Sequence, residues 1–223
     1  MQKIIAVFCA SVFCVSIFAA TLKADPALDA ILARMDQAAP NFHAMSANVS
    51  MIEYQKILDD RTTDTGTLKM QRKGKNVRAV VSFPDRMIGF LGDIVRIYFS
   101  NTQSYQDYKI GQNSDVLNQF LLLGFGSSGR ELAQAYDITL GGTENVAGQN
   151  VTKLVLIPKD SKVKERLSKI DVWIPSDAAN PVQQQFYEPS GNWRKVTYSD
   201  IVVNPSMPGT LEMKLPQGAK KQG

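Results

Sequence analysis

Three glycines near the middle of the chain have the spacing of a phosphate-binding loop. Gly124, Gly126 and Gly129 form a G-x-G-x-x-G pattern, which in dinucleotide-binding proteins follows a parallel β-strand and opens a helix whose N-terminus faces the pyrophosphate. Such sites also use an acidic residue about 20 positions further on, where this chain has Gln149. The flanking sequence predicts antiparallel strands, so we interpret the glycines as a hinge between two short helices and expect no nucleotide cofactor.

The residue types needed for catalysis are scarce. His43 is the only histidine, and the two cysteines, Cys9 and Cys14, lie in the apolar N-terminal segment. Without them the mature chain has no Cys–His pair or histidine metal site, and no G-x-S-x-G segment presents a serine to His43. The scattered carboxylates Asp93, Asp107, Asp137 and Glu144 fit turns or solvated strand faces. The sequence therefore predicts a protein that is not an enzyme and holds no metal.

The first 24 residues have the pattern of a secretory signal peptide. A positive start at Lys3 is followed by the apolar stretch 4–20, and the small residue Ala24 ends the segment. The alternative is an uncleaved anchor, since about 17 to 25 apolar residues can cross a bilayer. We expect cleavage near Ala24, which makes the mature protein periplasmic and removes both cysteines.

The mature chain has an almost balanced charge. Without Lys3 and Lys23, 23 Lys and Arg residues remain against 21 Asp and Glu residues, a net charge of about +2. So small a charge gives no case for binding to nucleic acid, which needs cations gathered along the phosphate backbone. No disulfide framework is available either, so the apolar core has to hold the fold together.

One domain is expected over residues 25–223, with a helix followed by two blocks of strands. Asp25 and Pro26 are typical of a helix start, and apolar residues recur at helical spacing until Pro40. Alternating Val, Ile, Thr and Tyr residues between turn signals predict strands near 46–57, 63–72, 76–83, 93–100, 104–110, 136–141, 151–157, 169–174, 182–188, 192–198 and 201–203. Most gaps are short, so neighbouring strands should be antiparallel. We expect one or two short helices within 116–134 and a flexible basic tail at about 219–223.

Apolar side chains gather on one face of the expected strands. Leu68, Met70 and Arg72 share a face because alternate residues of a strand point the same way. Two more rows are Val77, Ala79, Val81 and Phe83, and Val95, Ile97 and Phe99. Such a face needs a partner, so the sheet must close into a barrel or be covered by the helices as a movable lid. Arg72 is then either a strand-end residue turned to solvent or a fixed donor at the rim of an apolar cavity.

Five motifs along the mature chain occur in the order found in one known family. They are NFHAMSA (41–47), GTLKMQR (66–72), IVRIYF (94–99), LIPK (156–159) and LPQG (215–218). With the N-terminal helix, they resemble the periplasmic outer-membrane lipoprotein carrier proteins, the LolA-like family. The resemblance implies a mainly β fold, a single antiparallel half-open β-barrel with an N-terminal helix and short central helices that form a lid.

The resemblance also suggests roles for particular residues. The expected cargo-binding residues are Leu68, Met70, Arg72, Val77, Val81, Phe83 and Ile97. The expected lid residues are Leu32, Met35, Leu121, Leu122 and Phe125, with the hinge at Gly124, Gly126 and Gly129. In the family, an arginine at the position of Arg72 hydrogen-bonds the lid and helps to keep the empty protein closed. Lys73 is a second candidate for this latch, because the register read from the downstream motif is shifted by one residue.

The function implied is that of a carrier. The protein would shelter the acyl chains of lipoproteins, as a monomer, and take them from an inner-membrane ABC-type lipoprotein-releasing complex to an outer-membrane acceptor. A carrier or sensor of another lipid, such as a glycolipid or phospholipid, would use the same half-barrel and is the alternative. A lipid hydrolase is disfavoured, because the sequence lacks a nucleophile paired with a base.

Overall fold

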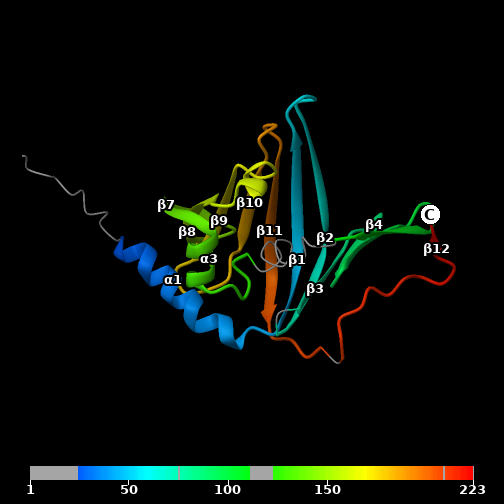
Figure 1. The fold of residues 1–223 in the computed structure, drawn as a ribbon, viewed down its shortest axis with the longest axis horizontal. Coiled ribbons are helices and arrows are strands. Elements are labelled where there is room, and N and C mark those ends of the chain that lie inside the picture. The colour runs from blue at the N-terminus through cyan, green and yellow to red at the C-terminus, as the bar shows by residue number, and fades with distance from the viewer. Residues whose placement is uncertain (1–24, 75, 111–122, 208, 223) are drawn as a thin grey trace, which may run out of the picture.

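The computed structural model describes residues 25–74, 76–110, 123–207 and 209–222. Within them twelve strands form one sheet in the order β12-β6-β5-β4-β3-β2-β1-β11-β10-β9-β8-β7 (Figure 1). The strands are β1 (Ala44–Gln55), β2 (Asp60–Lys73), β3 (Asn76–Ser82), β4 (Arg86–Leu91), β5 (Ile94–Phe99), β6 (Ser104–Lys109), β7 (Tyr136–Val146), β8 (Gln149–Pro158), β9 (Lys169–Pro175), β10 (Gln183–Tyr187), β11 (Trp193–Val203) and β12 (Lys220–Lys221). Neighbours are antiparallel except β12 with β6, and β7 and β12 lie at opposite edges, so the sheet stays open. The predicted mainly β, half-open fold is confirmed.

The helices are short, and side-chain caps fix where they begin. They are α1 (Pro26–Ala38), the 3-10 turn η1 (Ala39–Asn41), α3 (Gly129–Ala135) and α4 (Ser161–Lys164). At the start of α1 the Asp25 carboxylate accepts a hydrogen bond from the backbone N–H of Ala27, and Ser128 and Glu131 form a capping box at the start of α3. α3 is one of the expected central helices. The expected signal peptide, residues 1–24, lies outside the described residues.

Strand pairing gives the sheet two different faces. Residues directly opposite each other on antiparallel strands point to the same side. Leu68 pairs with Val81 across β2 and β3, and Met51 pairs with Val196 across β1 and β11. These residues define the inner face, which is apolar as the sequence predicts. The same pairing carries the inner face on to β8 and β9, where Leu154 faces the helices.

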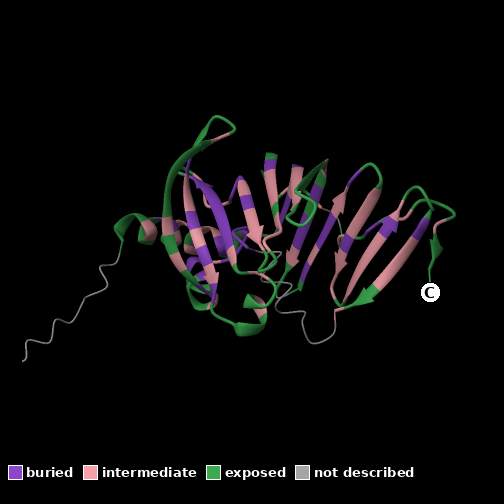
Figure 2. Ribbon diagram, turned by 90° about the horizontal axis from the view of Figure 1, so that it is seen from above, coloured by how far each residue is buried: buried purple, intermediate pink, exposed green. Residues whose placement is uncertain are grey.

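The inner face is covered by helices over β7 to β9. Ile31 and Met35 of α1 and Leu132 of α3 pack against Leu154 and Ile170 in a cluster whose side chains are almost fully buried. All but one residue of β9 is buried, whereas β5 has a single buried position (Figure 2). Burying large aliphatic side chains stabilises a fold by about 1.5–3 kcal/mol each, so this cluster contributes substantially to the stability of the fold.

The C-terminal segment, residues 209–222, crosses the outer face of β2 to β5 and ends at the sheet edge. Met213 packs on Val80 and Tyr98, and the Gln71 side chain bonds the backbone of this segment at two points. Lys220 and Lys221 then pair with β6 as β12, where the sequence led us to expect a flexible tail. The pairing occupies backbone groups of β6 that would otherwise form an open edge.

Two strand assignments from the sequence are wrong. β4 was not expected, because Arg86–Leu91 does not alternate and contains Gly89, over which the C-terminal segment passes. A side chain at Gly89 would come within 2.7 Å of the Met213 sulfur. β11 is one strand rather than two. It bulges near Asp200, which has a φ of 51°, and a bulge bends a strand without ending it.

Candidate functional site

A cavity of about 630 Å³ lies on the inner face, beside the part that the helices cover. Its wall comes from β1 to β4, β10 and β11, with Phe83 after β3, Phe125 from the loop before α3 and Leu167 between α4 and β9. The lining side chains are mostly apolar: Val49, Met51, Leu68, Met70, Ala79, Val81, Phe83, Ile88, Phe90, Phe125, Leu167, Phe186, Val196 and Tyr198. Volumes of about 300–1,000 Å³ are typical of sites for small organic ligands. The cavity is therefore suited to an apolar ligand.

Four of the expected cargo residues meet in this wall. Leu68, Met70, Val81 and Phe83 all line the cavity. Val77 is 1% exposed and belongs to the same apolar cluster as these lining residues, but it does not line the cavity. Ile97 pairs with the lining residue Ile88, so it lies on the inner face but outside the cavity. Alternation along β2 and β3 thus identified the wall from the sequence. Its continuation on β1 and β11 depends on pairing between distant segments.

Arg72 contacts the loop that leads into α3. Its Nη1 donates a hydrogen bond of 2.6 Å to the Gly126 carbonyl, and its Nε donates one of 3.1 Å to the Gly74 carbonyl. The neighbouring cation does something else, since Lys73 Nζ donates to the Gly209 carbonyl at 2.8 Å, in the C-terminal segment. Of the two residues considered for a latch, Arg72 is therefore the one that reaches the loop.

The loop is also held by a buried chain of polar groups. The Tyr198 hydroxyl donates to the Gln184 side chain at 2.6 Å, and Gln184 Nε2 donates to the Leu123 carbonyl at 2.5 Å. Phe125 packs edge-on against the Tyr198 ring, with 4.9 Å between centroids. Burial raises the pKa of the Tyr198 phenol, so the hydroxyl keeps its proton. Gln184 and Tyr198 are not predicted from the sequence, and only their place on the inner face of strands could have indicated them.

The other expected lid residues lie elsewhere. Met35 and Leu32 belong to the cluster over β7 to β9 and do not line the cavity. Leu121 and Leu122 lie outside the described residues. Among the expected lid residues that the structure describes, Phe125 alone covers the cavity.

The three central glycines are needed for close packing. A Cβ at Gly126 would come within 2.3 Å of the Phe42 ring, and one at Gly129 within 2.4 Å of the Leu32 carbonyl oxygen. Gly124 and Gly126 both have a φ of 76°, a conformation that favours glycine. These contacts account for the G-x-G-x-x-G spacing without a nucleotide. A hinge at these positions stays a prediction.

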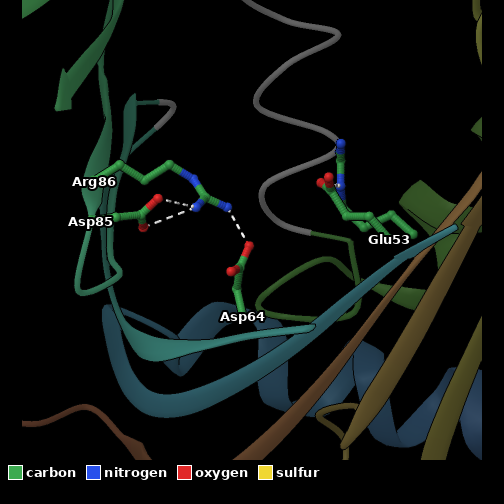
Figure 3. A network of polar contacts seen from close by, with 5 residues as sticks. Glu53, Asp64, Asp85 and Arg86 are labelled. Carbon is green, nitrogen blue, oxygen red and sulfur yellow. Dashed lines mark hydrogen bonds and ion pairs between the residues drawn. The ribbon is translucent and has the colours of Figure 1, made fainter. Parts of the chain in front are cut away.

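One end of the cavity is charged. Here Glu53, Arg86 and Arg194 join the lining, and we call this group the polar end of the cavity. Arg194 Nε donates to Glu53 at 2.6 Å. Arg86 binds Asp64 at 2.5 Å and Asp85 at 3.0 Å (Figure 3). Each guanidinium that lines the cavity thus has a carboxylate partner. For Arg86, which is largely shielded from solvent, this pairing offsets the cost of placing a charge beside apolar side chains.

Neither metal binding nor membrane crossing by helices is indicated in the described ranges. No group of three or more His, Cys, Asp or Glu side chains there could hold a metal ion. No helix in those ranges is long and apolar enough to span a bilayer.

The fold and the cavity together define a class of protein, an open antiparallel sheet with an apolar ligand site on its inner face. No family model and no curated protein matches the sequence. Among solved structures, an uncharacterized conserved protein from Thermus thermophilus has a TM-score of 0.52 at 12% identity, covering 87% of this chain and 97% of that one.

Two further solved structures have lower TM-scores. For lipoprotein LppX from Mycobacterium tuberculosis the TM-score is 0.48 at 18% identity, covering 82% of this chain and 98% of that one. For a putative outer membrane lipoprotein-sorting protein domain from Vibrio parahaemolyticus it is 0.42 at 14% identity, covering 81% and 92%. At these identities the likeness to the solved structures is one of fold alone.

Proposed function

We propose that this chain is a periplasmic carrier that shelters the acyl chains of lipoproteins in the inner-face cavity and moves them from the inner to the outer membrane. The observation that supports this most is the cavity itself, about 630 Å³ with a mostly apolar wall. Each buried methylene is worth about 0.8 kcal/mol, so a chain of about sixteen carbons left in water costs on the order of 12 kcal/mol. A carrier must supply a comparable apolar surface.

A carrier must also give its cargo up, and the contact of Arg72 with Gly126 supports a way to do so. A closed state held by this hydrogen bond competes with the loaded state, because its closing free energy subtracts from the affinity for cargo. In this proposal Arg72 is the latch and Phe125 is the part of the lid that moves off the cavity. Gly124, Gly126 and Gly129 are the hinge. Leu68, Met70, Val81 and Phe83 are the acyl-chain contacts.

The proposed partners follow from the energetics. Taking an acylated protein out of the inner membrane costs free energy. Because no nucleotide site is proposed in this chain, an ATP-driven complex in the inner membrane would have to supply that free energy. Delivery needs an outer-membrane acceptor that binds the cargo more tightly. The chain would act as a monomer. The second candidate is a carrier or sensor of a glycolipid or phospholipid, which the same apolar wall would also suit.

Release of lipoproteins from spheroplasts tests the proposal. The wild-type protein should move labelled lipoproteins from the spheroplast membrane into solution, and Val81→Arg, which places a charge in the cavity wall, should not. Val202 is a matched control, because it is 50% exposed and lies outside the cavity, so Val202→Arg should act like the wild type. Equal release by Val81→Arg would exclude the cavity as the cargo site.

A further inference from the structure

The most exposed large apolar side chains of the described residues lie together at the tip of one hairpin. Ile57 is 94% exposed and Leu58 is 67% exposed, between β1 and β2. This hairpin projects beyond the neighbouring strands (Figure 1). Exposed apolar residues scattered singly are ordinary, but here two adjacent ones form a small exposed apolar point at the end of a projecting hairpin.

The hairpin is braced, so it holds this point in a fixed place. The Tyr54 and Trp193 rings stack at 5.4 Å, and the Arg61 guanidinium lies over both. The backbone N–H of Lys56 donates to the Asn192 side chain at 3.0 Å, which ties the tip to the turn between β10 and β11. A tip tied to the turn of another hairpin keeps its position relative to the sheet.

The tip lies at the same end of the sheet as the polar end of the cavity. Glu53 and Arg194 pair directly across β1 and β11, and the chain reaches Ile57 four residues after Glu53. Arg86 begins β4 at this end of the strands, opposite the end of β5. The contact of Arg72 with Gly126 is at the other end, where β2 finishes. Whatever the tip contacts is therefore brought to the polar end of the cavity.

The chemistry of the tip favours a lipid bilayer as its partner. Two side chains are far too few for a stable protein interface, which needs about 800 Å² on each partner. The charges of Lys56 and Arg61 are balanced by Asp59 and Asp60, so the tip selects neither sign of surface. Trp and Tyr side chains are enriched at the water–membrane boundary, and the Tyr54 and Trp193 rings lie just behind the apolar point.

We propose that Ile57 and Leu58 insert into the surface of a bilayer and place the polar end of the cavity against it. This goes beyond the proposed function, since it concerns how the protein meets a membrane and not what it carries. Insertion of two side chains gives weak, reversible binding, which suits a protein that must leave the membrane again. Because the local charges balance, the contact should form on neutral lipid.

Tryptophan quenching tests the proposal directly. Leu58→Trp adds an emission that phosphatidylcholine vesicles carrying brominated acyl chains should largely quench, because bromine acts only on rings that enter the bilayer. Val202→Trp is the matched control, at an exposed position at the far end of β11, and its added emission should be unchanged. Quenching of the added emission reports only on the substituted position, so membrane contact made by another part of the chain does not change the difference between the two variants.

A second variant measures the strength of the contact. Ile57→Asp should weaken binding to the same vesicles by about 10- to 100-fold, since the transfer of one isoleucine is lost. Its stability should be that of the wild type, because Ile57 contacts so little. Unquenched emission from Leu58→Trp, unchanged binding by Ile57→Asp, or binding abolished by moderate salt would each overturn the proposal. Cargo release from spheroplasts is measured separately, so either proposal can fail while the other stands.

Discussion

The Arg72 guanidinium and the Gly126 carbonyl, 54 residues apart in the chain, are joined by a hydrogen bond of 2.6 Å. The bond ties the end of β2 to the loop that carries Phe125 over the cavity. A hydrogen bond to a charged group is worth about 1.5–3 kcal/mol, which is enough to shift the proposed balance between a closed and an open loop by about one to two orders of magnitude.

Replacing Arg72 should therefore slow the release of cargo. Arg72→Leu should fold and take up lipoprotein, but hold it about 10- to 100-fold longer, because the closed state no longer competes with the loaded one. The dissociation rate of a fluorescent acylated peptide measures this. Lys73→Leu is the control, since Lys73 bonds the C-terminal segment and not the loop. The same dissociation rate for Arg72→Leu and wild type would exclude Arg72 as the latch.

A methyl group at Gly126 should destabilise the loop through a specific clash. Gly126→Ala would place Cβ 2.3 Å from the Phe42 ring, in addition to the strain of a φ of 76°. Gly74→Ala is a matched control, because Gly74 has a φ of 60° and open space around it. Denaturant unfolding should show a loss of about 1 kcal/mol for Gly74→Ala and at least about 2 kcal/mol more for Gly126→Ala. Equal losses would show that the packing against Phe42 yields easily.

The buried bond between Tyr198 and Gln184 should contribute to stability. Tyr198→Phe keeps the ring against Phe125 but leaves the Gln184 oxygen without its donor, at a cost of about 1–3 kcal/mol in the free energy of unfolding. Tyr108→Phe, at a half-exposed position, should change it by less than about 0.5 kcal/mol. Chemical denaturation measures both. A Tyr198→Phe protein as stable as the wild type would mean that Gln184 finds another donor.

Part of the stability should disappear in acid, through Asp107. The Arg96 guanidinium, bonded to both carboxylate oxygens at 2.6 and 2.9 Å, and Lys221 lower the pKa of Asp107 from 3.8 to about 2. A carboxyl whose pKa is lower in the folded state stabilises the fold above its ordinary pKa and loses this effect as pH falls towards the folded value. The contribution, about 1–2 kcal/mol, should therefore be lost between about pH 4 and pH 2. Asp107→Asn should be less stable at pH 7 and show a smaller loss over that interval, by thermal unfolding.

The features that could be predicted from the sequence are those that depend on a local pattern of residues, such as the faces of strands and the starts of helices. Alternation along β2 and β3 identifies Leu68, Met70 and Val81 on one face, and the helix start at Asp25 follows from capping chemistry. β4 escapes the same reasoning because Gly89 leaves room for Met213, which is 124 positions further along the chain. That contact is a tertiary one with no trace in the local pattern.

The polar end of the cavity and the bond network behind Phe125 could not be predicted, for a similar reason. Glu53 and Arg194 are 141 residues apart, and they meet only because β1 pairs with β11 in one particular register. Leu123 and Gln184 are 61 residues apart. Ile57 and Leu58 occupy a turn between strands, where two apolar residues could equally have folded back onto the sheet. Their exposure comes from the length of the hairpin.

Mass spectrometry of the protein purified gently after export tests the central claim most directly. We expect acylated lipoprotein to co-purify with the wild-type chain in amounts that Val81→Arg lacks, because the charge occupies the acyl-chain wall. A phospholipid or glycolipid in its place would contradict lipoprotein as the cargo while leaving the cavity as the binding site. A wild-type chain that holds no more lipid than Val81→Arg would contradict the carrier itself.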